Sequence, residues 1–369
     1  MSLLLPAAPP LTPDRTTQKI RFNFPDGLRG LAAIWVMGQH LWVDQHTPQL
    51  FQTLPAGLNR VLFQFGYLGV GIFFVLSGFF MAHALRRTAI TRHNLGWLYA
   101  RRWLRLSPAY YAAIGLAIGC SAIVAAFNGQ TFIAPSFATL LKHFTYFQGL
   151  LPAETINGVY WTLCIEIQFY FAFCLLLGAI QWIDCRWPQG QFRRTVFWTI
   201  ALLVTTLWPA QLWHSSGFEE ATLLPYWYSC LLGAWVYWVW QKQQPPMILW
   251  GYCGLLAVIT IQTRSLFVGV VLLTALSLSV AGAKDGLAHW LNWRWLQKLG
   301  QLSYAFYLVH EPLLKVLFPI EHRLLGAHLW VDIGGILLNF ALCVGMAQLL
   351  HYYIEQPGIR WSQRVLLKP

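Results

Sequence analysis

A succession of long apolar segments, separated by short charged or turn-rich stretches, constrains this chain more than any other feature. Charged residues make up 10% of it, against about a quarter in soluble globular proteins, and 57% of the residues are hydrophobic. A run of about 20 apolar residues is what a helix needs to cross a bilayer. We therefore predict an all-α polytopic membrane protein, which excludes a soluble enzyme, a disordered chain and a small disulfide-stapled secreted domain.

About ten membrane-spanning helices with short loops fit the 369 residues. The segments 248–263 and 265–282 are separated only by Arg264, so they form either a tight hairpin or one broken element. The longest outside segment, 128–158, is expected to form a short interfacial helix or a cap over a cavity. The predicted spans lie near 28–46, 61–85, 104–127, 159–180, 196–213, 225–241, 248–263, 265–282, 299–318 and 330–354.

The distribution of basic residues predicts the orientation. With the N-terminus inside, most of the 25 lysine and arginine residues fall in cytoplasmic segments, as the positive-inside rule requires. We therefore expect both termini on the cytoplasmic side of a bacterial inner membrane. The predicted domains are a cytoplasmic tail (1–25), a transmembrane domain (26–358) and a second cytoplasmic tail (359–369). The proline-rich start has no long apolar stretch after a basic one, so a cleaved signal peptide is not expected.

The net charge and the cysteine pattern argue against nucleic-acid and metal ligands. The net charge of +12 comes from basic residues at the ends of apolar runs, which are membrane anchors, so no nucleic-acid partner is expected. The seven cysteines contain no CxxC pair and mostly lie within apolar runs, so we expect no metal site and no permanently bound cofactor. The sequence leaves the oligomeric state open.

Ionisable side chains inside predicted spans are candidates for function, because burying them in hydrocarbon costs several kcal/mol without a partner or water. His40 lies roughly 18 Å above the cytoplasmic start of its span, and Glu166 lies roughly 10 Å below the outer surface, at 1.5 Å per residue. In a hydrocarbon core about 30 Å thick, the two side chains share a similar depth. We therefore predict that Glu166 is the carboxylate partner of a catalytic His40, with packing or a proton relay as the alternative.

Polar residues also follow helical spacings. Arg29 and His40 are 11 positions apart, which places both on one helix face about 16 Å apart. The arginines at 101, 102 and 105 are either cytoplasmic anchors or a clamp for phosphate groups. Ser303, Tyr307 and His310 form a polar stripe, which is typical of helix–helix contacts as well as of catalytic sites.

Six motifs together resemble the acyltransferase-3 family of integral membrane acyltransferases, from about residue 22 to 360. They are, in order, Asp26-Gly-Leu-Arg29 followed by His40; Gly69-Val-Gly-Ile-Phe-Phe-Val-Leu-Ser77-Gly78-Phe79; Arg101-Arg102-Trp-Leu-Arg105-Leu-Ser-Pro108; Tyr160-Trp161-Thr162 followed by Glu166 and Phe169-Tyr170; Ser303-Tyr304 followed by Tyr307 and His310; and Glu355-Gln-Pro357. One departure is Thr162, where serine is commoner in the family, and it keeps the hydroxyl.

The resemblance implies transfer of an acyl group, most often acetyl, from acetyl-CoA or another acyl-CoA to a hydroxyl of a carbohydrate or glycolipid acceptor. His40 would be the general base, and Glu166 would orient it or hold the sugar. Arg29 and the arginines at 101, 102 and 105 would bind the donor's phosphates. Candidates for contacting the acceptor or the oxyanion are Ser77, Trp161, Ser303, Tyr307 and His310.

The same buried charges admit two other functions. A proton-coupled transporter or flippase of a sugar or lipid-linked sugar would use His40 and Glu166 as a relay, although no inverted pair of Gly/Pro-broken helices is visible. A membrane receptor or scaffold would make the shared face of Arg29 and His40 a coincidence. Release of free CoA by membranes, compared between the wild type and His40→Ala, separates an acyltransferase from both.

Overall fold

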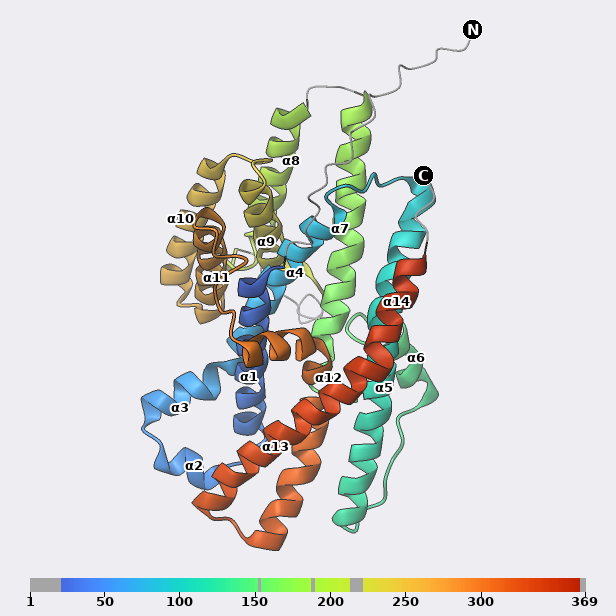
Figure 1. The fold of residues 1–369 in the computed structure, drawn as a ribbon, viewed down its shortest axis with the longest axis vertical. Coiled ribbons are helices and arrows are strands. Elements are labelled where there is room, and N and C mark those ends of the chain that lie inside the picture. The colour runs from blue at the N-terminus through green and yellow to red at the C-terminus, as the bar shows by residue number, and fades with distance from the viewer. Residues whose placement is uncertain (1–20, 152–153, 187–189, 213–221, 366–369) are drawn as a thin grey trace.

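The protein is a bundle of helices (Figure 1). A computed structural model describes residues 21–151, 154–186, 190–212 and 222–365, and this part of the chain contains no β-strand. The α-helices are α1 (Asn23–Val43), α2 (Pro48–Thr53), α3 (Ala56–Leu62), α4 (Gly69–Leu85), α5 (Arg92–Phe127), α6 (Phe137–Phe144), α7 (Trp161–Arg186), α8 (Gly190–Thr205), α9 (Trp227–Trp240), α10 (Pro246–Thr263), α11 (Leu266–Ala283), α12 (Arg294–Leu325), α13 (Leu329–Leu350) and α14 (Gln356–Arg364). Short 3-10 turns η1 (Gln64–Leu68) and η3 (Leu224–Tyr226) and the π-helical turn η4 (His351–Glu355) connect some of them.

Six helical segments are long and apolar enough to cross a membrane, which confirms a polytopic membrane protein. They are Ala56–Leu85, Asn94–Phe127, Trp161–Arg186, Pro246–Thr263, Leu266–Ala283 and Leu329–Arg364. A helix also coincides with each of the other four predicted spans. Of these, α8 and α9 have only 16 and 14 residues, and α1 and α12 carry several charged side chains. The count of ten spans therefore stays a prediction.

The structure defines the conformation of segments 248–263 and 265–282 and of the outside segment 128–158. Helices α10 and α11 form a tight hairpin, in which Arg264 adopts a left-handed conformation (φ 54°) and the Ser265 side chain caps α11. The predicted outside loop contains the short helix α6, whose His143 bonds the Tyr110 hydroxyl of α5 at 3.0 Å. Segment 128–158 is thus tied to the middle of α5 by a buried hydrogen bond.

Glycines lie at the points where pairs of helices cross most closely. At the crossing of α1 and α12, a Cβ added to Gly300 would lie 2.0 Å from the Asp26 carbonyl oxygen. At the crossing of α4 and α9, a Cβ on Gly78 would lie 1.6 Å from the Cys230 oxygen, and one on Gly233 would lie 1.8 Å from the Val75 oxygen. Small residues let helix backbones approach closely where lipid offers no hydrophobic drive for association. The first crossing brings the motif-bearing helices α1 and α12 together, and Gly69 of α4, where a Cβ would lie 2.9 Å from the Ala32 oxygen, brings α4 against α1.

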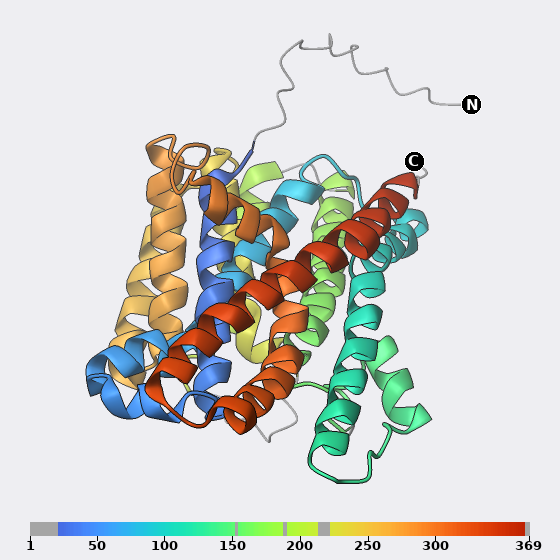
Figure 2. The same ribbon diagram turned by 60° about the horizontal axis from the view of Figure 1, so that its bottom comes forward.

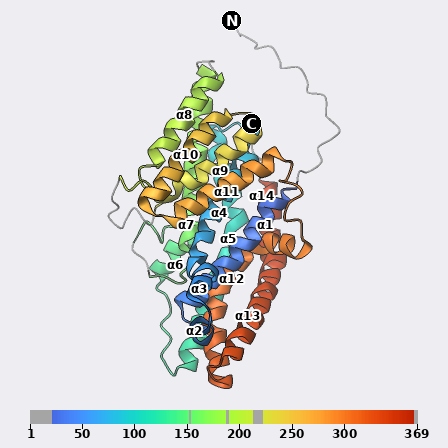
Figure 3. The same cartoon turned by 90° about the vertical axis from the view of Figure 1, so that its left-hand side faces the viewer.

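Helices α8 to α11 gather toward one end of the molecule, and α2, α3 and the start of α13 lie toward the other (Figures 1 and 3). From that second end α13 runs diagonally across the bundle into α14 (Figure 2). The start of α1 and the end of α14 lie toward the same end of the molecule (Figure 2). Most of the predicted N-terminal tail, residues 1–20, and the last four residues of the predicted C-terminal tail fall outside the described residues.

Candidate active site

An elongated cavity of about 520 Å³ lies between α1, α4, α5, α7, α12 and the end of the α13–α14 arm. Its wall follows α4 from Val70 to Leu85, which corresponds to roughly 22 Å of helix at 1.5 Å per residue. This volume falls in the usual range for sites that bind small molecules. A wall of this length suits an extended ligand rather than a compact one.

All four arginines that the sequence singled out line this cavity: Arg29, Arg101, Arg102 and Arg105. Arg29 lies over the Phe80 ring, with its guanidinium carbon 5.9 Å from the ring centroid, and Arg102 lies 5.5 Å from the centroid of Tyr170. Guanidinium groups are well suited to binding phosphates through paired N–H donors. The arginines from two helices therefore form one basic wall.

Local structure explains why the arginines of α5 face the cavity. Pro108 has no backbone N–H, so the Leu104 carbonyl oxygen loses its helical donor. Gly358 of α14 packs against that oxygen, because a Cβ there would lie only 2.9 Å from it. Two residues further along, the Tyr304 hydroxyl of α12 donates to the Leu106 carbonyl at 2.8 Å. Contacts from α12 and α14 thus fix the segment of α5 that carries the arginines.

Glu166 also lines the cavity, but its partner differs from the predicted one. Its Oε1 accepts a hydrogen bond from Nη2 of Arg102 in an ion pair whose side chains are 16% (Arg102) and 21% (Glu166) exposed. No hydrogen bond or ion pair joins Glu166 to His40 among the described residues. A shared depth says nothing about which way each helix turns its side chains, so the pairing of Glu166 with His40 stays a prediction.

Hydroxyl groups gather in the wall of the cavity. Ser77, Ser303 and Tyr307 line it, as does Thr162, whose hydroxyl is hydrogen-bonded to that of Tyr307 at 3.0 Å. Ser303 is fully buried, and its Oγ has no hydrogen-bond partner among the described residues. A buried hydroxyl without a partner is costly unless a ligand supplies one, so Ser303 is a candidate donor to a bound carbonyl oxygen.

Trp161 is a predicted site residue that the cavity lining does not include. It begins α7, and 39% of its surface is exposed. Its ring packs on Phe74, a cavity residue, and on Tyr226, at 6.5 and 5.4 Å between centroids. Trp161 therefore supports the wall from outside and does not line it.

His40 lies beyond the cavity, next to His310 of α12. The two imidazole rings are 5.1 Å apart, and the Tyr307 ring is 5.7 Å from that of His310. Tyr307 thus stands between the cavity and the histidine pair. His310 is buried, and its Nε2 has no hydrogen-bond partner in the described part of the chain; the same is true of Nδ1 of His40. Each of these two ring nitrogens therefore has an unused hydrogen-bonding capacity.

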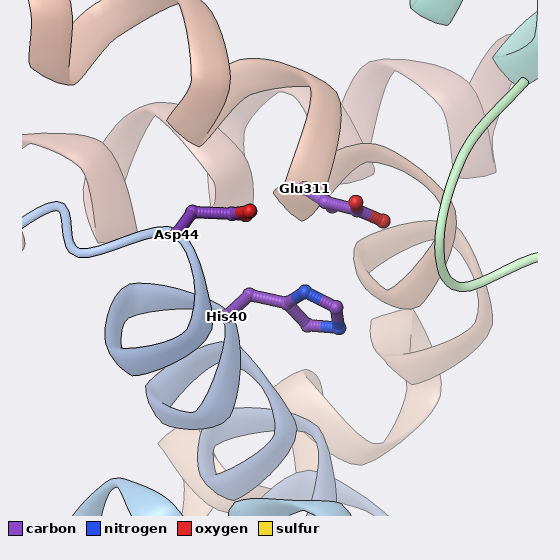
Figure 4. Close-up of side chains that lie close together, drawn as sticks. All are labelled: His40, Asp44 and Glu311. Carbon is purple, nitrogen blue, oxygen red and sulfur yellow. The ribbon is translucent and has the colours of Figure 1, made fainter.

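The carboxylates beside His40 are Asp44 and Glu311, which the sequence interpretation missed (Figure 4). Each offers an oxygen, and these oxygens and a ring nitrogen of His40 all lie within 4.8 Å of one another. Glu311 is 2% exposed and forms an ion pair with Lys315 one turn along α12. It follows His310 directly within a predicted span, so the membrane-cost argument applied to Glu166 would have found it.

Such a group of one imidazole and two carboxylates has the donor chemistry of a divalent cation site. The Lys315 ammonium, however, already contacts Oε1 of Glu311 and supplies a positive charge at that oxygen. We therefore interpret the group as a histidine beside two carboxylates, one of which is neutralised by Lys315. The expectation that no metal is bound stays a prediction.

The comparisons with known proteins point to one family. The model of the acyltransferase-3 family, described as an acyltransferase domain, matches residues 22–348. Acyltransferase MdmB from Streptomyces mycarofaciens is 25% identical over 92% of this chain and 92% of its own length. Peptidoglycan O-acetyltransferase OatA from Listeria monocytogenes is 24% identical over 93% of this chain and 57% of its own length. No solved structure matches the chain.

The fold is that of a polytopic membrane protein, and its basic cavity ends beside a histidine pair. The match over residues 22–348 specifies the class further: the chain belongs to the acyltransferase-3 family and is an acyltransferase. The alternatives of a transporter and of a receptor or scaffold find no support in these similarities.

Proposed function

We propose that the protein moves an acyl group, acetyl in the simplest case, from a coenzyme A thioester to a hydroxyl of a carbohydrate or glycolipid acceptor. The observation that carries this proposal is the elongated cavity, which has four arginines in its wall and Tyr307 beside the His310–His40 pair. Coenzyme A combines anionic phosphates with a long flexible arm that ends in the thioester. Phosphates at the arginines would direct that arm along the cavity toward Tyr307.

In this proposal His40 takes the proton of the acceptor hydroxyl as the hydroxyl oxygen attacks the thioester carbonyl carbon. A carbon–oxygen bond forms, the carbon–sulfur bond breaks, and the proton passes from His40 to the departing thiolate. The Ser303 hydroxyl, which has no partner among the described residues, is positioned in the cavity wall to donate to the developing oxyanion. The Arg102–Glu166 pair holds one guanidinium in place for the donor.

The nature of the acceptor is proposed from the relatives. One of them is named a peptidoglycan O-acetyltransferase, so a hydroxyl on a carbohydrate is the acceptor class that we favour. The donor would enter at the side of Arg29 and the arginines of α5, which positive-inside orientation assigns to the cytoplasm of a bacterial inner membrane.

The test is acyl-CoA-dependent release of free CoA by purified protein in detergent or nanodiscs, supplied with a carbohydrate acceptor extract. We expect His40→Ala to lower the rate by roughly 10²–10⁴-fold, the usual contribution of a positioned base. His289→Ala is the matched control, because that histidine has a 72% exposed side chain outside the site. Equal rates for His40→Ala and the wild type would contradict the role of His40.

A further inference from the structure

Glu311 has one oxygen that is held and another that is open. Its Oε1 accepts from Lys315 and from the Gly158 backbone N–H, the latter at 3.3 Å. Gly158 permits this approach, because a Cβ at that position would lie 2.8 Å from the same oxygen. Its Oε2 is buried without a hydrogen-bond partner among the described residues. The carboxylate is thus fixed on one side and has an unused acceptor on the other.

One carboxylate oxygen of Glu311 lies within 4.8 Å of a ring nitrogen of His40. In Figure 4 the ring edge that carries Nδ1 is turned toward Glu311 and Asp44, and Nε2 points away from both. Nδ1 itself is buried and has no partner in the part of the chain described. Catalytic hydrogen bonds are often long before substrate binds, so a separation within 4.8 Å is close enough for a direct or water-bridged contact.

We propose that Glu311, held by Lys315 and Gly158, is the positioning residue for His40. The inference rests on the proposed function of His40 as the general base. A carboxylate at Nδ1–H would leave Nε2 as the proton acceptor and would stabilise the imidazolium that forms when the acceptor hydroxyl gives up its proton. Glu311 gains and loses no proton in this step.

The charged and titratable groups around His40 come from two segments. Asp44 and His46 follow it at the end of α1, and His310, Glu311 and Lys315 face it from α12. Asp44 is the less suitable partner, because its side chain is 24% exposed and its nearest cationic contact is a histidine nitrogen at 3.7 Å. Glu311 is 2% exposed and anchored, so its position is better defined.

Glu311→Gln tests this role, because it keeps the shape and removes the charge. We expect turnover to fall by at least about tenfold, and by up to the roughly 10⁴-fold seen when a triad carboxylate becomes an amide. The acidic limb of the pH–rate profile should move to lower pH by about one unit, because the imidazolium loses a stabilising charge. Lys315→Met should move the same limb to higher pH, by less, because the ammonium is 44% exposed.

Two controls separate this role from a structural one. Glu321→Gln removes another acid of α12, which bonds Asn339 outside the site, and should leave the profile unchanged. Glu311→Asp keeps the charge, so its rate should lie above that of Glu311→Gln; this comparison is decisive if Glu311→Gln folds poorly. CoA binding, measured by equilibrium dialysis, verifies that each variant retains the donor site.

Opposite shifts in Glu311→Gln and Lys315→Met support the proposal. A wild-type profile in Glu311→Gln, or a shift only in Asp44→Asn, would overturn it while leaving His40 as the base. If His40→Ala also keeps full activity, the proposed function itself fails.

Discussion

The ion pair between Arg102 and Glu166 makes a prediction that distinguishes the structure from the sequence interpretation. We expect Arg102→Gln and Glu166→Gln to be coupled in a double-mutant cycle, because each single change leaves an unpaired charge in the cavity wall. The double variant leaves neither charge, so it should be destabilised by less than the sum of the single variants.

The size of the coupling follows from charge and burial. Opposite unit charges about 4 Å apart attract by about 4 kcal/mol at an effective dielectric constant of about 20. The two side chains are 16% and 21% exposed, so water in the cavity screens part of this attraction. We therefore expect a coupling free energy of about 1–3 kcal/mol in the free energy of unfolding.

Denaturant titration of the purified protein in detergent micelles measures the four free energies of unfolding. A second cycle, His40→Ala with Glu166→Gln, is the control and should be additive within about 0.5 kcal/mol. A coupling below about 0.5 kcal/mol for Arg102 and Glu166, together with a larger coupling for His40 and Glu166, would refute the pairing.

Three further outcomes are expected. Burial lowers the pKa of His143, so its neutral form is favoured in the folded protein. The free energy of unfolding should therefore fall as the pH drops below about 6.5. Over the same pH range, the difference in melting temperature between the wild type and His143→Gln should shrink. Gly78→Ala places a Cβ 1.6 Å from the Cys230 oxygen and should lower the melting temperature sharply. Gly254→Ala is the control and should not, because a Cβ there has no neighbour within 4 Å. Equal melting temperatures for the two variants would show that α4 and α9 can move apart without cost. Ser303→Ala should lower kcat by roughly 10²–10³-fold with little change in CoA affinity if its hydroxyl binds the oxyanion, and an unchanged kcat would remove it from that role.

The sequence predicted the helical class, because hydrophobic runs report directly on which segments can enter a bilayer. It also predicted several of the residues that line the cavity. Arg29 and Arg102 were expected near one mouth from the basic clusters and the family motifs, and both line the same wall. These features depend on composition and spacing along the chain.

Pairings between helices were harder to predict. The depth of Glu166 along α7 was estimated from helical rise, but its pairing with Arg102 depends on the rotation of α7 about its axis, which no single span reveals. Glu311 was not predicted, although it directly follows the polar stripe of Ser303, Tyr307 and His310. The 3-10 turn η1 that separates α3 from α4 was likewise invisible within the apolar run 61–85.

Cryo-electron microscopy of the protein with bound CoA tests the proposed donor site most directly. We expect the phosphates to lie within hydrogen-bond distance of at least two of Arg29, Arg101, Arg102 and Arg105. The thiol should lie at the other end of the cavity, beside Tyr307 and on the His310–His40 side. CoA bound elsewhere, or with its phosphates away from the arginines, would contradict the assignment of this cavity to the donor.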